Sequence, residues 1–434
     1  MAHAARFNLP VRASVLPNGV RVLTAAMSHV RSVSVGVWIG VGSRHESDEE
    51  AGASHFLEHL LFKGSDRLSA RDISESIEGV GGQVNAYTSE EVTCCFASVP
   101  SDRLPVAMDV MAEMFLRAAC RQGDIRRERG VILDELSLYR DQPQSAADEA
   151  LNQALWPRHP LGRPVPGLPR SVKALTRPRL MEFRDRHYVA SGTVIAVSGD
   201  LSHEAVVRLA RRAFGAMPAR AAAPAARPAS EAGRVKRLAL HPREIEQSHL
   251  ALGFATAGYH DRRRYALRLL NVVLGENTSS RLFQRIREAD GLAYSVQSGV
   301  SQFSDCGALT VTASTDVADE DRVLGAVVRE CRRLSANGPS AAELGRARDY
   351  VVGQARMGLE SSAQCMTWLG EHTLMYGRVV PPWMHEKRLA EVTVEDVREM
   401  ARLVLKSDRS ALAVVGPEVV RRKDNYLRAL GRLG

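Results

Sequence analysis

The feature that most constrains the fold is a low-complexity stretch in the middle of the 434-residue chain. Residues 218–234 read PARAAAPAARPASEAGR, which is rich in Ala and Pro and lacks a hydrophobic period, as is typical of a linker. The chain is also too long for a single compact core. We therefore predict a first domain over residues 1–217, a linker over 218–234 and a second domain over 235–434.

Both halves of the chain run through a similar order of elements. In the first half, VSVGVWIGVG and VTCCFASV are typical of strands, and the amphipathic segment HEAVVRLARRAFG is typical of a helix. The second half repeats this outline with SHLALGFATA, GALTVTAST and DRVLGAVVRECRRL. We predict an α+β fold of two homologous domains related by duplication, each a mainly antiparallel sheet covered by helices.

Charge and composition argue against several classes of protein. The chain has 58 Lys and Arg against 50 Asp and Glu, but the basic residues are spread along it, so we expect no nucleic acid partner. The longest apolar run is about half a membrane span, so we expect no membrane segment. The six cysteines show no C-x-x-C spacing and are expected to be reduced, and the N-terminus has no apolar signal core. We expect a cytoplasmic protein, with the mitochondrial matrix as a less favoured alternative.

The segment AGASHFLEHLLFKG, residues 51–64, places polar side chains on an otherwise apolar helix. His55, Glu58 and His59 occupy positions i, i+3 and i+4, which share one face. Two imidazoles one turn apart can bind the same zinc ion, and Glu58 then lies beside the ion as a general base for water. The alternative is a local hydrogen-bond network without metal.

A catalytic zinc ion needs a third protein ligand. The best candidate is a carboxylate on the predicted helix RRERGVILDELSLYRD. Glu128 and Glu135 are seven residues apart and therefore lie on the same stripe of that helix. The spacing does not choose between them, and each is also compatible with a plain surface acid.

Five segments together resemble the pitrilysin and insulinase family of zinc metallopeptidases, most closely the branch of mitochondrial processing peptidase and its bacterial relatives. They are HFLEHLLFKG, GGQVNAYTSEE, ERGVILDEL, HPLGRPVPG and SSRLFQRIREADGLAYSV. The resemblance implies that His55, His59 and Glu135 bind one zinc ion per chain. It implies that Glu58 is the catalytic base and that Glu128 is a second acid that supports the site.

The resemblance also implies residues that bind the substrate. Asn85, in QVNAYTS, matches the strand along which the family holds extended peptides; without the resemblance it would be a turn or strand-end residue. Arg287 and Tyr294, in READGLAY, match a pair that reaches the peptide near the scissile bond, where both can donate to a developing oxyanion. Without the resemblance they would be an exposed helix arginine and a half-buried strand tyrosine.

Long members of the family close four homologous domains into a clamshell around a chamber. A chain with two such domains is half of that shell, so the resemblance implies a homodimer in which the zinc site of one copy faces Arg287 and Tyr294 of the other. The expected activity is an endopeptidase that hydrolyses short unfolded peptides inside a closed chamber.

Two points of function stay open. Relatives that cleave presequences use acidic residues after the third ligand, but this chain has Ser145 where an acid is expected, followed by Asp148 and Glu149, so we favour general peptide degradation. The alternatives are a catalytic subunit that needs a different partner chain, and a non-catalytic scaffold subunit like the core proteins of respiratory complexes.

Overall fold

The chain folds into two compact units, each built from separate segments of sequence. The computed structural model describes residues 10–222, 226–231 and 235–433, so residues 223–225 and 232–234 of the predicted linker lie outside the described residues. The first unit contains Met1–Leu136, Pro164–Arg227 and Gln354–Met384, and the second contains Ser137–Arg163, Pro228–Gly353 and His385–Gly434. Each unit thus draws on both halves of the chain. The division at residues 218–234 stays a prediction.

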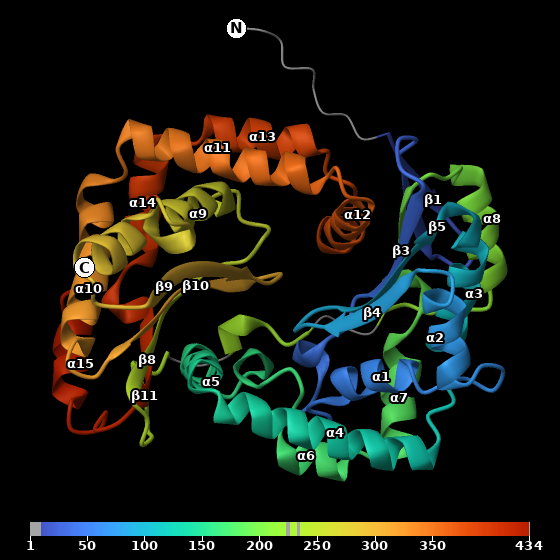
Figure 1. The fold of residues 1–434 in the computed structure, drawn as a ribbon, viewed down its shortest axis with the longest axis horizontal. Helices are drawn as coiled ribbons and strands as arrows, with labels where there is room; N and C mark the ends of the chain where they lie inside the picture. Colours follow the sequence, from blue (N-terminus) through green and yellow to red (C-terminus); the bar gives the residue numbers. More distant parts are fainter. Residues whose placement is uncertain (1–9, 223–225, 232–234, 434) are drawn as a thin grey trace, which may run out of the picture. The chain divides into compact units, whose positions relative to one another are not determined.

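A six-stranded sheet forms the centre of the first unit, with the order β1-β2-β6-β3-β5-β4 (Figure 1). Strands β2 and β6 are parallel, and every other neighbouring pair in this sheet is antiparallel. The strands are β1 (Val11–Val15), β2 (Arg21–Ala26), β3 (Ser32–Ile39), β4 (Gln83–Thr88), β5 (Thr93–Pro100) and β6 (Thr193–Gly199). Strand β4 is therefore an edge strand of this sheet.

The two faces of this sheet carry different side chains because successive residues of a strand point to opposite sides. On β3, Val33, Val35 and Val37 pack into the core that α1, α2 and α3 cover, whereas Trp38 packs against α12. The helices of the first unit are α1 (Ala53–Leu61), α2 (Ala70–Glu78), α3 (Leu104–Arg117), α4 (Gln122–Asp141), α6 (Pro169–Ala174), α7 (Arg177–His187), α8 (His203–Phe214) and α12 (Ser362–Tyr376). The last turn of α4 continues into the second unit.

A five-stranded sheet forms the centre of the second unit, with the order β7-β11-β8-β10-β9. Its strands are β7 (Leu238–Pro242), β8 (Gln247–Ala257), β9 (Ser295–Gln302), β10 (Cys306–Asp316) and β11 (Ser410–Gly416). The helices are α5 (Pro143–Leu155), α9 (Arg264–Asn271), α10 (Glu320–Asn337), α11 (Ala341–Gly358), α13 (Pro382–Glu391), α14 (Val394–Val404) and α15 (Lys423–Gly431). Two π-helical segments, Val272–Glu276 and Phe283–Ala289, complete this set. Helices α11 and α13 each have one end in the first unit.

The two sheets repeat one topology. When β1 is left aside, β2-β6-β3-β5-β4 corresponds strand by strand to β7-β11-β8-β10-β9. The parallel pair of β2 and β6 has its counterpart in the parallel pair of β7 and β11, and the remaining pairs are antiparallel in both sheets. The predicted α+β fold of two mainly antiparallel sheets with helices is confirmed.

Each sheet is covered on one face by a helix from the other half of the sequence. Helix α12, which follows β10 in the chain, packs on β3, β6 and β2 of the first sheet, and α5, which follows β5, packs on β11 and β8 of the second. Small residues line both contacts, with Gly36 and Gly370 at α12 and Gly253 and Ala251 at α5. A helix can approach a sheet closely only where such small residues remove the obstructing side chains.

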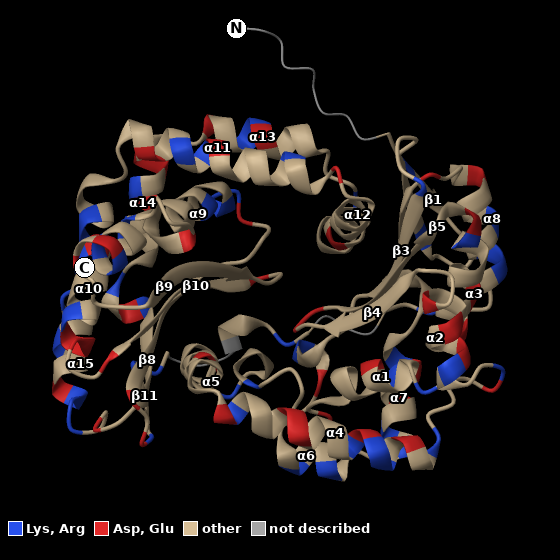
Figure 2. Cartoon of the chain, viewed as in Figure 1, with Lys and Arg blue, Asp and Glu red and all other residues tan. Residues whose placement is uncertain are grey.

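The structure shows how the charged residues are distributed, whether a helix could span a membrane and where the cysteines lie. Figure 2 shows Lys and Arg interspersed with Asp and Glu along the helices of both units. Within the described ranges, no helix has the length and apolar character that a membrane span requires. All six cysteines are free thiols, and all but the half-buried Cys306 are buried.

Candidate metal centre

Helix α1 begins at a tightly constrained position. Gly52 has a φ of 94°, and a Cβ atom there would lie 2.6 Å from the carbonyl oxygen of Pro166. The carboxylate of the buried Glu46 accepts hydrogen bonds from the backbone amides of Gly52 and Ser54, both at 2.7 Å. A carboxylate in this place satisfies free amides and interacts favourably with the helix dipole. The helix start is therefore fixed, and with it the direction of the side chains in the next turn.

The side chains of His55, His59 and Glu135 converge on one point. Their ligand atoms all lie within 4.8 Å of one another. The Oε2 atom of Glu135 lies 3.7 Å from Nε2 of His55 and 3.6 Å from Nε2 of His59. These separations are too long for hydrogen bonds. They are close to the roughly 3.3–3.5 Å that separates donors sharing a tetrahedral zinc ion with bonds of about 2.0–2.2 Å.

His55 has the protonation form that a metal ligand needs. Burial is the main cause that lowers the pKa of His55 to about 4, and the neighbouring His59 lowers it further. The His55 imidazole is therefore neutral at pH 7, which is the form that coordinates a cation. Two imidazole nitrogens and one carboxylate oxygen also form the donor set of several catalytic zinc sites. The residues present thus fit a zinc ion in both geometry and chemistry.

Glu128 lies directly behind the second histidine. Its Oε2 atom is 3.2 Å from Nδ1 of His59, and its Oε1 atom is 2.8 Å from Nζ of Lys63. Glu128 is buried, whereas Arg127 and Arg129 pair with other groups, so Glu128 is not a surface acid that balances them. A carboxylate that accepts a hydrogen bond from Nδ1 leaves the Nε2 lone pair of His59 directed at the metal position.

Glu58 is half-buried beside this group and has its own partner. Its Oε2 atom accepts a hydrogen bond of 2.6 Å from Oγ1 of Thr88, at the end of β4. Burial raises the pKa of Glu58, while the hydrogen bond from Thr88 acts in the opposite direction. A carboxylate with a raised pKa beside a metal position is suited to accept and return a proton.

Asn85 lies on the same edge strand, on the face opposite to Thr88. It is exposed, and its Oδ1 atom accepts a hydrogen bond of 2.8 Å from the backbone amide of Ala86. Within its sheet, β4 pairs only with β5, so its outer edge is open to a further strand.

Arg287 and Tyr294 form a separate pair in the second unit. Arg287 lies on the π-helical segment Phe283–Ala289, and Tyr294 immediately precedes β9. The guanidinium carbon of Arg287 is 5.5 Å from the centre of the Tyr294 ring, and the tyrosine is 80% exposed. The structure thus collects the predicted residues into two groups, one in each unit.

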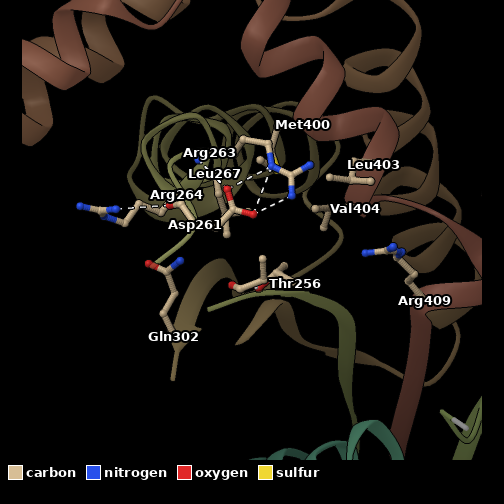
Figure 3. A pocket seen from close by; sticks show the side chains of 11 residues that line it. Thr256, Asp261, Arg263, Arg264, Leu267, Gln302, Met400, Leu403, Val404 and Arg409 are labelled. Atoms are coloured by element: carbon tan, nitrogen blue, oxygen red, sulfur yellow. Dashed lines mark hydrogen bonds and ion pairs between the residues drawn. The ribbon is translucent and has the colours of Figure 1, made fainter. Parts of the chain in front are cut away.

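A cavity of about 80 Å³ lies entirely within the second unit (Figure 3). It is lined by Thr256, by Gln302 and by apolar residues of α14, and its one carboxylate, Asp261, is bound by Arg263 at 2.6 Å. None of the predicted site residues lines it.

Two residues near the metal position were not singled out from the sequence. Thr88 and Lys63 both lie within segments that carry the family resemblance, QVNAYTS and HFLEHLLFKG. A threonine in a strand and a lysine after a helix are common on protein surfaces. Only the fold, which places them against Glu58 and Glu128, distinguishes them.

Comparisons with known proteins define the class. A model described as insulinase, peptidase family M16, matches residues 21–167, and a model described as the peptidase M16 inactive domain matches residues 174–351. Relatives called uncharacterized zinc proteases are 41% identical in Mycobacterium tuberculosis, over 97% of both chains, and 35% identical in Bacillus subtilis, over 92% of this chain and 97% of that one. The chain therefore belongs to the insulinase family of peptidases, M16.

Solved structures show the same fold. A protease from Helicobacter pylori has a TM-score of 0.88 at 20% identity, over 95% of this chain and 100% of that one. A chain of complex III from Candida albicans has a TM-score of 0.81 at 19% identity, over 97% of this chain and 99% of that one. The fold is thus common to a protease and to a chain of complex III.

Proposed function

We propose that this protein is a zinc-dependent endopeptidase that binds one zinc ion per chain and hydrolyses short, unfolded peptides. The observation that carries the proposal is the convergence of His55, His59 and Glu135 beside Glu58, in a chain of the M16 family. Relatives named as zinc proteases at about 40% identity over nearly the full chain support the same activity.

Each residue of the site has a separate role in the proposed hydrolysis. A zinc ion bound at this position would act as a Lewis acid and would lower the pKa of water to about 7. His55, His59 and Glu135 would hold the ion, and Glu128 would orient His59. Glu58 accepts the proton of the attacking water and returns it to the amine that leaves when the peptide bond breaks.

The open edge of β4 is the proposed binding surface for the peptide. An extended peptide that adds to this edge forms main-chain hydrogen bonds and therefore binds with little dependence on sequence. Asn85 lies on that strand and offers an exposed amide. Because no acid occupies position 145, we favour general degradation of peptides over presequence cleavage.

The proposed assembly is a homodimer that encloses the site in a chamber in the bacterial cytoplasm. In it, Arg287 and Tyr294 of one copy donate hydrogen bonds to the peptide bound by the other. Size-exclusion chromatography with light scattering on the purified chain, combined with a peptidase assay, tests this. An active dimer supports it, and an inactive monomer that gains activity with a different chain contradicts it.

Two substitutions test the activity itself. We expect Glu58→Gln to keep one zinc ion per chain and to lose cleavage by about 10²- to 10⁴-fold, the typical contribution of a general base. We expect Glu135→Gln to lose zinc. Asp134→Asn is the matched control, because Asp134 is the exposed neighbour of Glu135. Metal content is measured by mass spectrometry of the elements and cleavage on a mixed peptide library. A Glu58→Gln variant that cleaves at the normal rate would refute the assignment.

A further inference from the structure

The two carboxylate oxygens of Glu58 have different surroundings. Oε2 accepts the 2.6 Å hydrogen bond from Oγ1 of Thr88. Among the described residues, Thr88 is the sole hydrogen-bond partner of Glu58, so Oε1 receives no hydrogen bond from them. A distance of 2.6 Å is typical of a hydroxyl that donates to an ionised oxygen, which is one of the stronger hydrogen bonds in proteins.

Thr88 lies in a paired part of the sheet. It faces Thr93 across the pair of β4 and β5, and the buried Thr93 donates a hydrogen bond of 2.9 Å to the carbonyl oxygen of Val41. Thr88 is also β-branched, which restricts its side-chain rotamers. The Thr88 side chain therefore has fewer rotamers than the longer Glu58 side chain, which accepts its hydrogen bond.

The residue before Thr88 anchors the strand on its other face. The hydroxyl of Tyr87 donates a hydrogen bond of 2.8 Å to Glu371 of α12 and accepts one of 3.1 Å from Nε1 of Trp38. The end of β4 is thus hydrogen-bonded to α1 through Thr88 and to α12 through Tyr87. A strand end held on both faces cannot shift without breaking one of these bonds.

We infer that Thr88 is a positioning residue that assigns separate roles to the two oxygens of Glu58. Thr88 holds Oε2, and Oε1 accepts the proton from water and later releases it to the leaving amine. Oε2 can accept the threonine hydrogen bond in both protonation states, so the carboxyl group does not rotate between the two proton transfers. The inference rests on the proposed function, in which Glu58 is the base.

Three variants test this role. Thr88→Val keeps the shape and removes the hydroxyl, Thr88→Ser restores a hydroxyl, and Thr310→Val is a matched change on a strand of the second unit. We expect Thr88→Val to lower kcat by about 10- to 100-fold with KM changed less than about twofold, because small misplacements of a catalytic group have effects of this order. Thr88→Ser should recover kcat to within about fivefold of the wild type, and Thr310→Val should match the wild type. Zinc content should stay at one ion per chain in all three.

Two further measurements distinguish a positioning role from a purely structural one. In a Glu58→Gln background, Thr88→Val should cause no additional loss of rate, because the two residues act as a unit. A crystal structure of zinc-bound Thr88→Val should show the Glu58 carboxylate in more than one orientation, and this readout holds even if the peptidase assay of the wild type fails. A Thr88→Val enzyme with normal kcat, a Thr88→Ser enzyme as slow as Thr88→Val, or a single unchanged Glu58 orientation would overturn the inference.

Discussion

The contact between Trp38 and helix α12 leads us to predict that a substitution at Gly370 lowers the stability of the protein. The indole ring of Trp38 is fully buried. A Cβ atom added at Gly370 of α12 would lie 2.4 Å from Cε3 of the ring, and one added at Gly36 would lie 2.4 Å from Cη2. The ring therefore contacts backbone at both glycines and has no room to move away. The substitution Gly370→Ala must push α12 away from the sheet or distort the ring.

The expected magnitude follows from two opposing effects. Inserting a methyl group into a packed core typically costs about 1–3 kcal/mol, and a clash with a ring held on two sides belongs at the upper end, about 3 kcal/mol. Gly370 lies in the interior of a helix, where Ala is favoured over Gly by about 1 kcal/mol. We expect Gly370→Ala to lower the free energy of unfolding by about 2 kcal/mol.

The assay is urea denaturation followed by circular dichroism, with Gly353→Ala as the matched control. Gly353 lies inside helix α11, and a Cβ atom there would meet nothing within 4 Å. The control should gain about 0.5–1 kcal/mol from helix propensity alone. If the two units unfold in separate steps, one transition should shift in Gly370→Ala. Equal stabilisation by both substitutions would refute the close packing of α12 on Trp38.

Two further predictions concern charged pairs. Lys63→Met removes the cation that pairs with the buried Glu128, so it should weaken zinc affinity by about tenfold, measured by competition with a chelator. Lys63→Arg keeps the positive charge and should retain the zinc affinity of the wild type. Equal zinc affinity in the wild type and both variants would contradict the role of Lys63. Hydrogen bonds from Arg281 are the main cause that lowers the pKa of Glu343 from 4.5 to about 2. The pair therefore stabilises the folded protein above pH 4.5, and this stabilisation is lost as the pH falls towards 2. The difference in unfolding free energy between the wild type and Glu343→Gln should therefore shrink between pH 6 and pH 3, and a constant difference would disprove this.

The sequence predicts features that depend on local order. The i, i+3, i+4 spacing of His55, Glu58 and His59 survives in the structure because helix geometry alone sets the shared face. The strands around VSVGVWIGVG and GALTVTAST are likewise where the alternation of apolar residues indicates. Glu135 required the family resemblance, because the distance between α1 and α4 depends on the packing of the whole unit.

Other features depend on contacts that no short segment encodes. Helix α5 presents Ala147, Ala150 and Ala154 to a sheet, but such a face suits any flat apolar surface. Its sequence position, within the predicted first domain, gives no sign that the partner is the sheet of the second unit. The hydrogen bond between Thr88 and Glu58 is equally remote in sequence, since it joins a strand to a helix 30 residues earlier.

The reciprocal placement of α5 and α12 has a consequence for how such a chain arose. Two identical subunits that exchange one helix form a domain-swapped dimer, in which each subunit completes the other. Joining two such subunits end to end would preserve the swap inside a single polypeptide, with the repeated sheets and the crossed helices seen here. Either half expressed alone would then leave one sheet face bare and would be expected to aggregate or to recapture its missing helix from a second copy.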